Sequence, residues 1–134
     1  MANALYDKGR NGFLSGDIDW LIDTIKAVLI DSADYTVNLA THQFFSEVPA
    51  LARVATATLG TKTAVDGVAD AADAVFTAVT GDISEALVIY KDTGVEATSP
   101  LIAYIDTATG LPVTPNGGDI TVQWDAGVNK IFRL

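Results

Sequence analysis

The sequence contains no cysteine and only one histidine, His42. Without thiols the chain has no disulfide, no thiolate metal ligand and no thiol nucleophile, so its core has to hold by packing alone. A single histidine rules out a two-histidine metal site, and any Ser-His-Asp arrangement would depend on His42. The surrounding stretch "ATHQFFS" contains no nucleophile-elbow pattern. We expect His42 to hydrogen-bond the backbone of its own loop or to take part in a subunit contact.

Positive charge is also scarce. Eight Lys and Arg residues stand against 17 Asp and Glu residues, which gives a net charge of −9 and a pI near 4.2. Such a chain repels phosphate backbones and anionic membrane surfaces, so we expect neither nucleic acid nor a membrane as a partner. No stretch approaches the roughly 18 to 20 apolar residues of a membrane span, and no signal-peptide pattern opens the chain. We therefore expect synthesis in the cytoplasm.

Motifs that hold cofactors are missing as well. No phosphate-binding loop of the form GxxxxGK[ST] or GxGxxG occurs. Two acidic pairs, Asp17 with Asp19 and Asp70 with Asp73, offer oxygen ligands for calcium, but neither has the spacing of an EF-hand loop. We expect no cofactor and no metal, and we expect that the protein is not an enzyme.

What the sequence does contain is apolar residues in a chain of one-domain length. Hydrophobic residues make up 49% of the 134 residues, and the mean hydropathy is +0.30. A chain of this size buries enough surface to fold without a metal or disulfide. The surplus of apolar residues indicates buried contacts between subunits.

Strand patterns dominate the second half of the chain. The runs "EALVIYK" and "PLIAYID" are rich in β-branched and aromatic residues, and turn residues end each run. Further on, Ile120, Val122 and Trp124 alternate with polar residues, which predicts a strand with one buried face. A last strand is expected over residues 130–134.

The first half is less uniform. Residues 17–30 carry apolar side chains at helical spacing, but "TIKAVLI" is β-branched and suits a buried strand equally well. The stretch "ALYDKGRNGFLSG" predicts a short helix closed by Gly16, and "DYTVNLATHQFFSEVPAL" predicts an irregular loop with one helical turn. Strands are also expected in "RVATATLG", "KTAVDG" and "DAVFTAV", whereas "VADAADA" is ambiguous.

Together these patterns predict a mainly β fold with about seven to eight strands, arranged as an antiparallel β-sandwich or barrel. We expect one domain overall, with residues 1–16 as an N-terminal arm or short helix and residues 17–134 as the β-domain.

One triplet in the sequence matches a known catalytic motif. Asp92-Thr93-Gly94 matches the signature of aspartic proteases, in which two such triplets supply a buried pair of carboxylates. Here Lys91 precedes the triplet, and similar Asp-to-Gly spacings follow other strands at Asp125 and Asp106. Repeated use of one pattern after strands is typical of turns, in which Asp accepts from nearby amides and Gly takes a positive φ. We predict a turn.

Several stretches together resemble a family of small structural proteins encoded in tailed-bacteriophage genomes. They are "GFLSGDIDW", "TIKAVLIDSADYT", "THQFFSEVP", "FTAVTGD", "EALVIYKDTGVEATSPLIAYIDT" and "GLPVTPNGGDITVQWD". The resemblance covers nearly the whole chain and is most specific from Glu85 to Asp106, whereas the alanine-rich residues 50–63 depart from it. It implies a virion component without catalytic residues, and it implies a strand at "DTIKAVLIDS" and another within "VADAADAVFTAV".

The resemblance and the composition lead to one expected role. We expect a capsid decoration protein, made in the host cytoplasm and located on the capsid surface, that binds the major capsid protein and self-associates, a trimer being one such form. The N-terminal arm from Ala2 to Leu14 and the loop from Tyr35 to Pro49 are the expected contacts. The residues expected at the interface are Leu5, Tyr6, Phe13, Leu14, Tyr35, His42, Phe44 and Phe45.

Two other roles remain open from the sequence. A neck, tail or fibre component of the virion would also be β-rich and acidic. A carbohydrate-binding module would use Trp20 and Trp124 to stack on sugar rings, although the alternation around Trp124 favours a core position.

Overall fold

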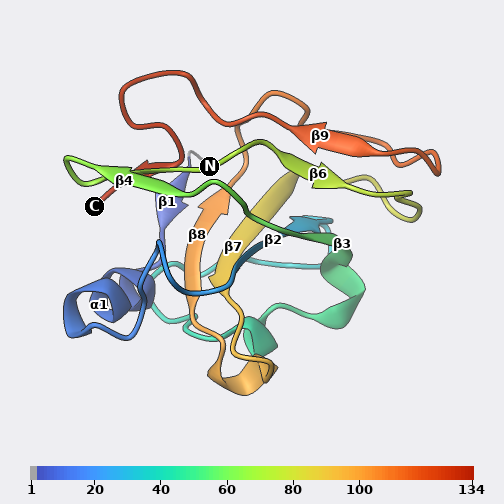
Figure 1. Cartoon of the computed structure of the whole chain (residues 1–134). Coiled ribbons are helices and arrows are strands. Elements are labelled where there is room, and N and C mark those ends of the chain that lie inside the picture. The colour runs from blue at the N-terminus through green and yellow to red at the C-terminus, as the bar shows by residue number, and fades with distance from the viewer. Residues whose placement is uncertain (1–2) are drawn as a thin grey trace.

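The computed structural model describes residues 3–134, which form a mainly β domain (Figure 1). Ten antiparallel strands, one α-helix and three short 3-10 helices lie in this range. The strands are β1 (Ala4–Leu5), β2 (Ile25–Ile30), β3 (Arg53–Thr58), β4 (Thr63–Val65), β5 (Val68–Asp70), β6 (Ala74–Phe76), β7 (Ala86–Lys91), β8 (Leu101–Ile105), β9 (Ile120–Val122) and β10 (Phe132–Arg133). The helices are α1 (Asp7–Ser15), η1 (Phe45–Glu47), η2 (Ala50–Ala52) and η3 (Glu96–Thr98). The predicted fold class is confirmed.

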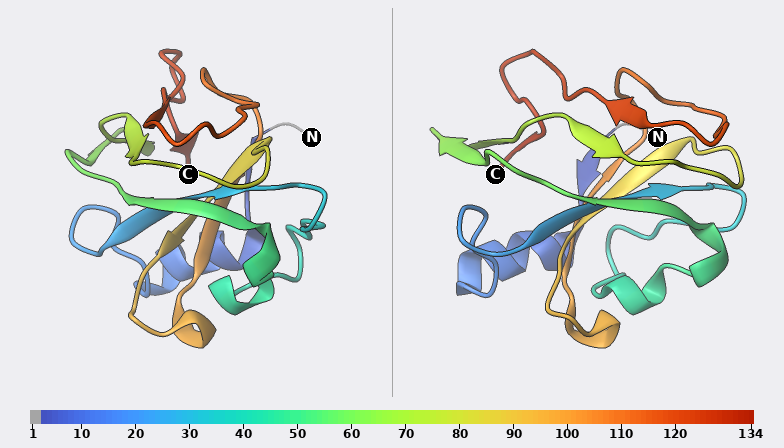
Figure 2. Two further views of the ribbon diagram at one scale, coloured as in Figure 1. Left: turned by 90° about the vertical axis from the view of Figure 1, so that its right-hand side faces the viewer. Right: turned by 45° about the vertical axis from the view of Figure 1, so that its right-hand side comes forward.

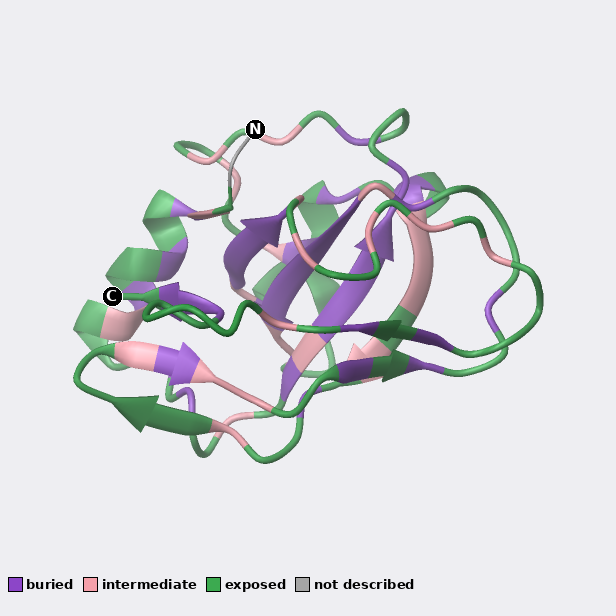
Figure 3. Ribbon diagram, turned by 90° about the horizontal axis from the view of Figure 1, so that it is seen from above, coloured by how far each residue is buried: buried purple, intermediate pink, exposed green. Residues whose placement is uncertain are grey.

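The centre of the fold is a five-stranded sheet in the order β1-β8-β7-β2-β3. Its inner strands are buried along almost their whole length, as the purple ribbons of Figure 3 show. Alternate residues of each strand enter two different core clusters, so that Leu87 and Ile89 pack on one face while Val88 and Tyr90 pack on the other. Because both faces are covered, "EALVIYK" and "PLIAYID" are continuously apolar instead of alternating.

Two small sheets and a long loop cover these faces (Figure 2). The sheets β10-β5-β4 and β6-β9 pack over one face and contribute Ala69, Phe76, Val122 and Phe132 to the core. Residues 31–52, which include η1 and η2, cover the other face. The result is a sandwich-like domain with an additional layer of irregular structure.

The N-terminal residues are built into this domain. β1 pairs with β8, and α1 then lies against β8 with its two glycines buried. A Cβ on Gly9 would lie 2.6 Å from the Leu101 carbonyl oxygen, so the close approach of α1 to the sheet requires glycine there. Gly16 ends the helix in the left-handed region with φ 82°, as predicted. Met1 and Ala2 of the predicted arm lie outside the described residues.

The conflict over residues 17–30 is settled in favour of a strand, but a shorter one. Ile25–Ile30 form β2, whereas the preceding residues form a turn in which Asp19 Oδ1 accepts from the backbone N–H of Leu21 and of Ile22. The ambiguous "VADAADA" contains β5 and the first residue of β6, with three residues outside regular structure between them, and the predicted strand in "DAVFTAV" is β6. In the described part of the chain, no helix is both long and apolar enough for a membrane crossing.

Candidate interaction surface

The structure corrects the predicted interface. Four of its residues, Leu5, Tyr6, Tyr35 and Phe45, are buried within the chain itself, and Tyr6 has no exposed surface at all. Leu5 packs with the core between the sheets, while the other three pack under residues 31–52. Instead of facing a partner, Tyr6, Tyr35 and Phe45 fill the space between the central sheet and residues 31–52.

The other four predicted residues are at least partly exposed. Leu14 projects from α1 with 83% of its surface accessible, while Phe13 packs toward Phe132 with ring centroids 5.7 Å apart. Phe44 forms an isolated bridge with Pro100 and lines a polar hollow of about 270 Å³. Phe13 and Leu14 thus lie on α1, whereas His42 and Phe44 lie in the loop that precedes η1.

His42 has the structural role predicted from its loop. Its Nδ1 lies 2.8 Å from the Tyr35 hydroxyl and 3.3 Å from the backbone N–H of Asn38. The Tyr35 hydroxyl also lies 2.8 Å from the Tyr6 hydroxyl, which extends the chain of hydrogen bonds into the core. Burial raises the pKa of Tyr6 above its ordinary range and that of Tyr35 to about 12. Both hydroxyls therefore stay protonated and connect the loop to the domain.

Phe45 connects the same loop to the central sheet. Its ring stacks on Tyr90 with centroids 3.9 Å apart, and the guanidinium of Arg53 lies 3.9 Å from the centroid of the Phe45 ring. Arg53 also donates to the carbonyls of Phe45 and Val48 and pairs with Glu96 at 2.9 Å. The sequence pattern did not indicate the stack of Tyr90, Phe45 and Arg53, because these three residues come from separate segments of the chain.

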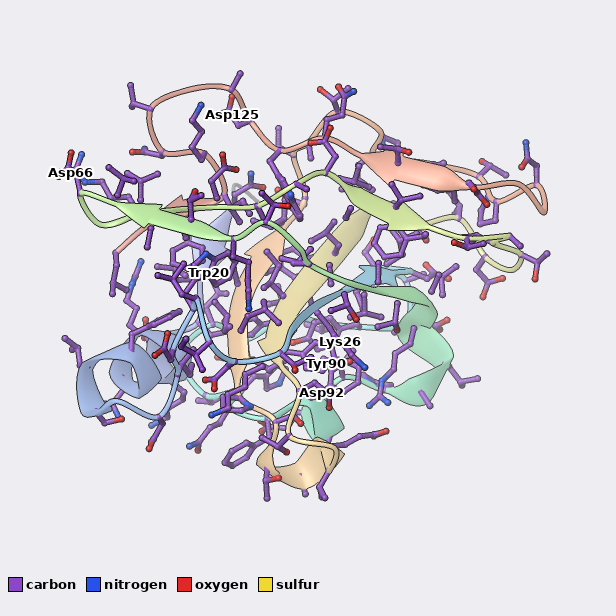
Figure 4. All side chains as sticks on the ribbon, in the orientation of Figure 1. Trp20, Lys26, Asp66, Tyr90, Asp92 and Asp125 are labelled. Carbon is purple, nitrogen blue, oxygen red and sulfur yellow. The ribbon has the colours of Figure 1, made fainter. Side chains whose placement is uncertain are left out.

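Asp92 forms the predicted turn. Its Oδ1 accepts from the backbone N–H of Gly94 at 2.9 Å, and Gly94 has φ 88°. Its other oxygen lies 2.7 Å from Lys26 Nζ on the neighbouring strand β2 (Figure 4). The Lys26 ammonium, followed by the Gly94 amide, holds the pKa of Asp92 below its ordinary value. A carboxylate held ionised in this way serves a turn and an ion pair.

Neither acidic pair considered for calcium belongs to the group of three carboxylates found among the described residues. That group is Asp31, Asp34 and Asp82, whose ligand oxygens lie within 4.8 Å of one another. Asp31 is buried and its Oδ1 accepts from the backbone N–H of Ala33. Because clusters of exposed carboxylates are common without a metal, we assign none to it.

The tryptophans proposed for sugar stacking are engaged within the domain. Trp20 is buried, packs edge-on against Phe132 and donates its indole N–H to the carbonyls of Thr63 and Asp70. Trp124 is half-buried against the core and donates to the Ala72 carbonyl. Trp20 thus has no free ring face for a sugar.

Exposed aliphatic side chains gather instead where the β4–β5 hairpin meets the C-terminal residues. Val65 and Val128 are 64% and 84% exposed and line a hollow of about 380 Å³. Leu134 is also exposed, and its N–H bonds the Gly67 carbonyl at the hairpin turn. Lys130 and Arg133 line the same hollow. We call these five residues the β4–β5 surface.

Sequence patterns alone did not single out this surface, although a signal was present. Val65 directly precedes the turn residues Asp66 and Gly67, and Val128 lies within the turn after Gly127. An apolar residue at a tight turn has little core to enter, so such positions are candidates for exposed contacts. Comparison of the sequence with models of known protein families and with curated proteins finds no significant match.

Proposed function

We propose that the chain is a non-enzymatic structural protein of a bacteriophage particle and that it decorates the capsid by binding the major capsid protein. The sequence resemblance to phage structural proteins supports this role. Its most specific part, Glu85 to Asp106, contains β7 and β8, two of the three inner strands of the central sheet. A rigid β-domain of this kind fits a protein that occupies many identical positions on a shell.

The observation that carries the proposal is the β4–β5 surface. Large aliphatic residues are exposed there although the domain already has two complete core clusters. Contiguous exposed apolar groups are typical of sites that bind another protein, because their burial contributes about 25 cal/mol per Å². The hollow is also lined by two cations, Lys130 and Arg133, and by two carboxylates, Asp66 and Asp70, so its charges balance. It therefore fits a shell region that is apolar with groups of both charges nearby.

The proposed contact with the shell lies in a different part of the molecule from the contact predicted from the sequence. The segments first expected to hold the shell, residues 2–14 and 35–49, supply core side chains such as Tyr6 and Phe45. Deleting residues 2–14 would remove part of the core and would test folding instead of attachment. Point substitutions on the β4–β5 surface avoid this difficulty because the affected side chains are exposed.

The test uses shells assembled from the major capsid protein and purified decoration protein. We expect the unmodified chain to sediment with the shells and to delay their disruption by heat. Val128→Asp should lower binding at least about tenfold, because a charge at the centre of an apolar contact costs more than 1.4 kcal/mol. Val95→Asp is the matched control, since Val95 is 57% exposed on the loop that carries η3. Equal binding by both variants, or none by the unmodified chain, would contradict the proposal.

A further inference from the structure

β4 is an open edge of the sheet β10-β5-β4. All three of its residues are exposed, and β5 is its neighbour on one side only. Figure 3 shows this strand wholly green beside the partly buried β5. Its shortness limits how much another strand can pair with it, but Thr63, Ala64 and Val65 include no proline and no charged side chain that would block such pairing.

The hairpin geometry shows which backbone groups face outward. Val65 pairs with Val68 across the turn, and Ala64 lies opposite Ala69. The Ala69 carbonyl accepts from the N–H of Ile131 on the β10 side, so Ala69 directs its polar groups away from β4. In an antiparallel ladder, two residues that lie opposite each other without exchanging hydrogen bonds both point their N–H and C=O groups away from each other. Ala64 lies opposite Ala69 in this way. Ala64 therefore offers one donor and one acceptor to the open side.

We propose that a second copy of this chain pairs with β4 in antiparallel orientation, about a two-fold axis that passes beside Ala64. Both polar groups of Ala64 then bond with Ala64 of the other copy. The same register places Thr63 opposite Val65, and Lys62 opposite Asp66, in each half of the pair.

Charge complementarity favours a second copy over an unrelated strand. Lys62 and Asp66 flank β4 at equal distances from Ala64, so an antiparallel copy brings opposite charges together twice. The Lys62 ammonium donates to the Asp23 carbonyl and also helps to lower the pKa of the Asp23 carboxyl, and two of its three protons remain for a second carboxylate. Asp66 lies at the exposed tip of the hairpin (Figure 4).

The pairing has two structural consequences. It joins two three-stranded sheets into one continuous sheet and places the two β4–β5 surfaces next to each other. Because only short strands take part, the contact is small and the dimer dissociates on dilution. A two-fold pair is also a different assembly from the trimer named as one form of a decoration protein. The inference does not depend on binding to a capsid, since it concerns the free protein.

A cysteine cross-linking experiment tests the register directly, because the natural chain has no cysteine. Thr63→Cys protein is mixed with Val65→Cys protein and oxidised. Opposite residues at this type of position lie about 4.5 Å apart between Cα atoms, within the range that a disulfide spans. In an equimolar mixture, random oxidation yields as much mixed dimer as both homodimers together, so we expect the mixed disulfide dimer to exceed the sum of the two homodimers. Val75→Cys, exposed on β6, is the control for random collisions.

Sedimentation at increasing concentration supplies the second measurement. The unmodified chain should shift from monomer toward dimer, and Ala64→Pro should raise the dissociation constant at least about tenfold because it removes the outward N–H. Asp66→Asn, which suits the same turn, should weaken the dimer even if Ala64→Pro does not fold. A monomer at every concentration, or mixed cross-linking no greater than that of Val75→Cys, would overturn the proposal.

Discussion

The Asp92 carboxylate lies 2.7 Å from the ammonium of Lys26, and it also accepts from the amide two residues further along its own turn. Lys26 belongs to β2 and lies across from Tyr90, so the ion pair joins the end of β7 to its neighbour. The triplet that resembles a protease signature thus stabilises the exit from a central strand.

Asp92→Asn separates the two contributions. The amide oxygen can still accept from Gly94, but the attraction to Lys26 is lost, and because both side chains are partly exposed we expect a loss of about 1 kcal/mol or less in the free energy of unfolding. Since the folded pKa of Asp92 lies below its ordinary value of 3.8, the ion pair contributes fully above that pH. The difference between variant and parent should therefore shrink as the pH falls through the folded pKa.

Denaturant unfolding at several pH values measures this difference. Asp125→Asn is the matched control, because Asp125 makes the same contact with the Gly127 amide. It should change the free energy of unfolding by no more than about 0.5 kcal/mol. A pH-independent difference for Asp92→Asn would refute the assigned ion pair.

Gly9→Ala should destabilise the protein although alanine is the better helix former by about 1 kcal/mol. The new Cβ would meet the Leu101 carbonyl at 2.6 Å, and backbone atoms of β8 cannot move aside cheaply. We expect a net loss of about 1 to 3 kcal/mol. Gly12→Ala on the same helix is the comparison, since its Cβ would meet only the end of the Ile18 side chain and should cost less. Thermal unfolding of the two variants shows which of them loses more stability. A Gly9→Ala protein as stable as its parent would contradict the close packing of α1 against β8.

Phe45→Ala and Phe44→Ala compare the loss of a buried ring with the loss of a partly exposed ring at adjacent positions. Phe45 is buried between Tyr90 and Arg53, so its truncation should cost about 3 to 5 kcal/mol. Phe44 is partly exposed and should cost clearly less. Calorimetry or chemical unfolding of both proteins measures the contrast. Similar losses for the two variants would show that the loop packs differently.

Alkaline pH should unfold the protein through its buried tyrosines. Burial raises the pKa of Tyr35 and of Tyr90 to about 12, whereas the unfolded value is 10.0. The protonated hydroxyls therefore contribute stability that is complete below the unfolded value and is lost as the pH rises toward the folded one. Tyr90→Phe keeps the stack on Phe45 and removes one titrating group, so its stability should decline less steeply above about pH 10. Parallel pH profiles for variant and parent would argue against this burial.

The central sheet could be predicted from sequence because its signal is local. Strands buried on both faces need continuous apolar runs, and β7 and β8 have them between turn residues. Strand β2 is ambiguous from sequence, since Ile18 and Leu21 continue its apolar spacing although Leu21 lies in a turn, Ile18 precedes that turn, and the two differ in burial. The spacing of apolar residues does not show where a strand begins when the residues before the strand are also apolar.

The contact surface could not be predicted in the same way. Tyr6 lies at the junction of β1 and α1, and Tyr35 lies in the loop after β2, and at such positions sequence gives no indication of the direction in which a side chain points. Their burial depends on residues 31–52 folding back over the sheet, which is a long-range event. The exposure of Val65 and Val128 depends equally on how distant turns meet at one end of the domain.

Cryo-electron microscopy of the purified particle is the most direct test of the proposed decoration role. We predict density for this domain at repeated positions on the outer shell, on the order of hundreds of copies, with the β4–β5 surface against the major capsid protein. Density confined to the neck, tail or fibres, with about a dozen copies or fewer, would contradict the account.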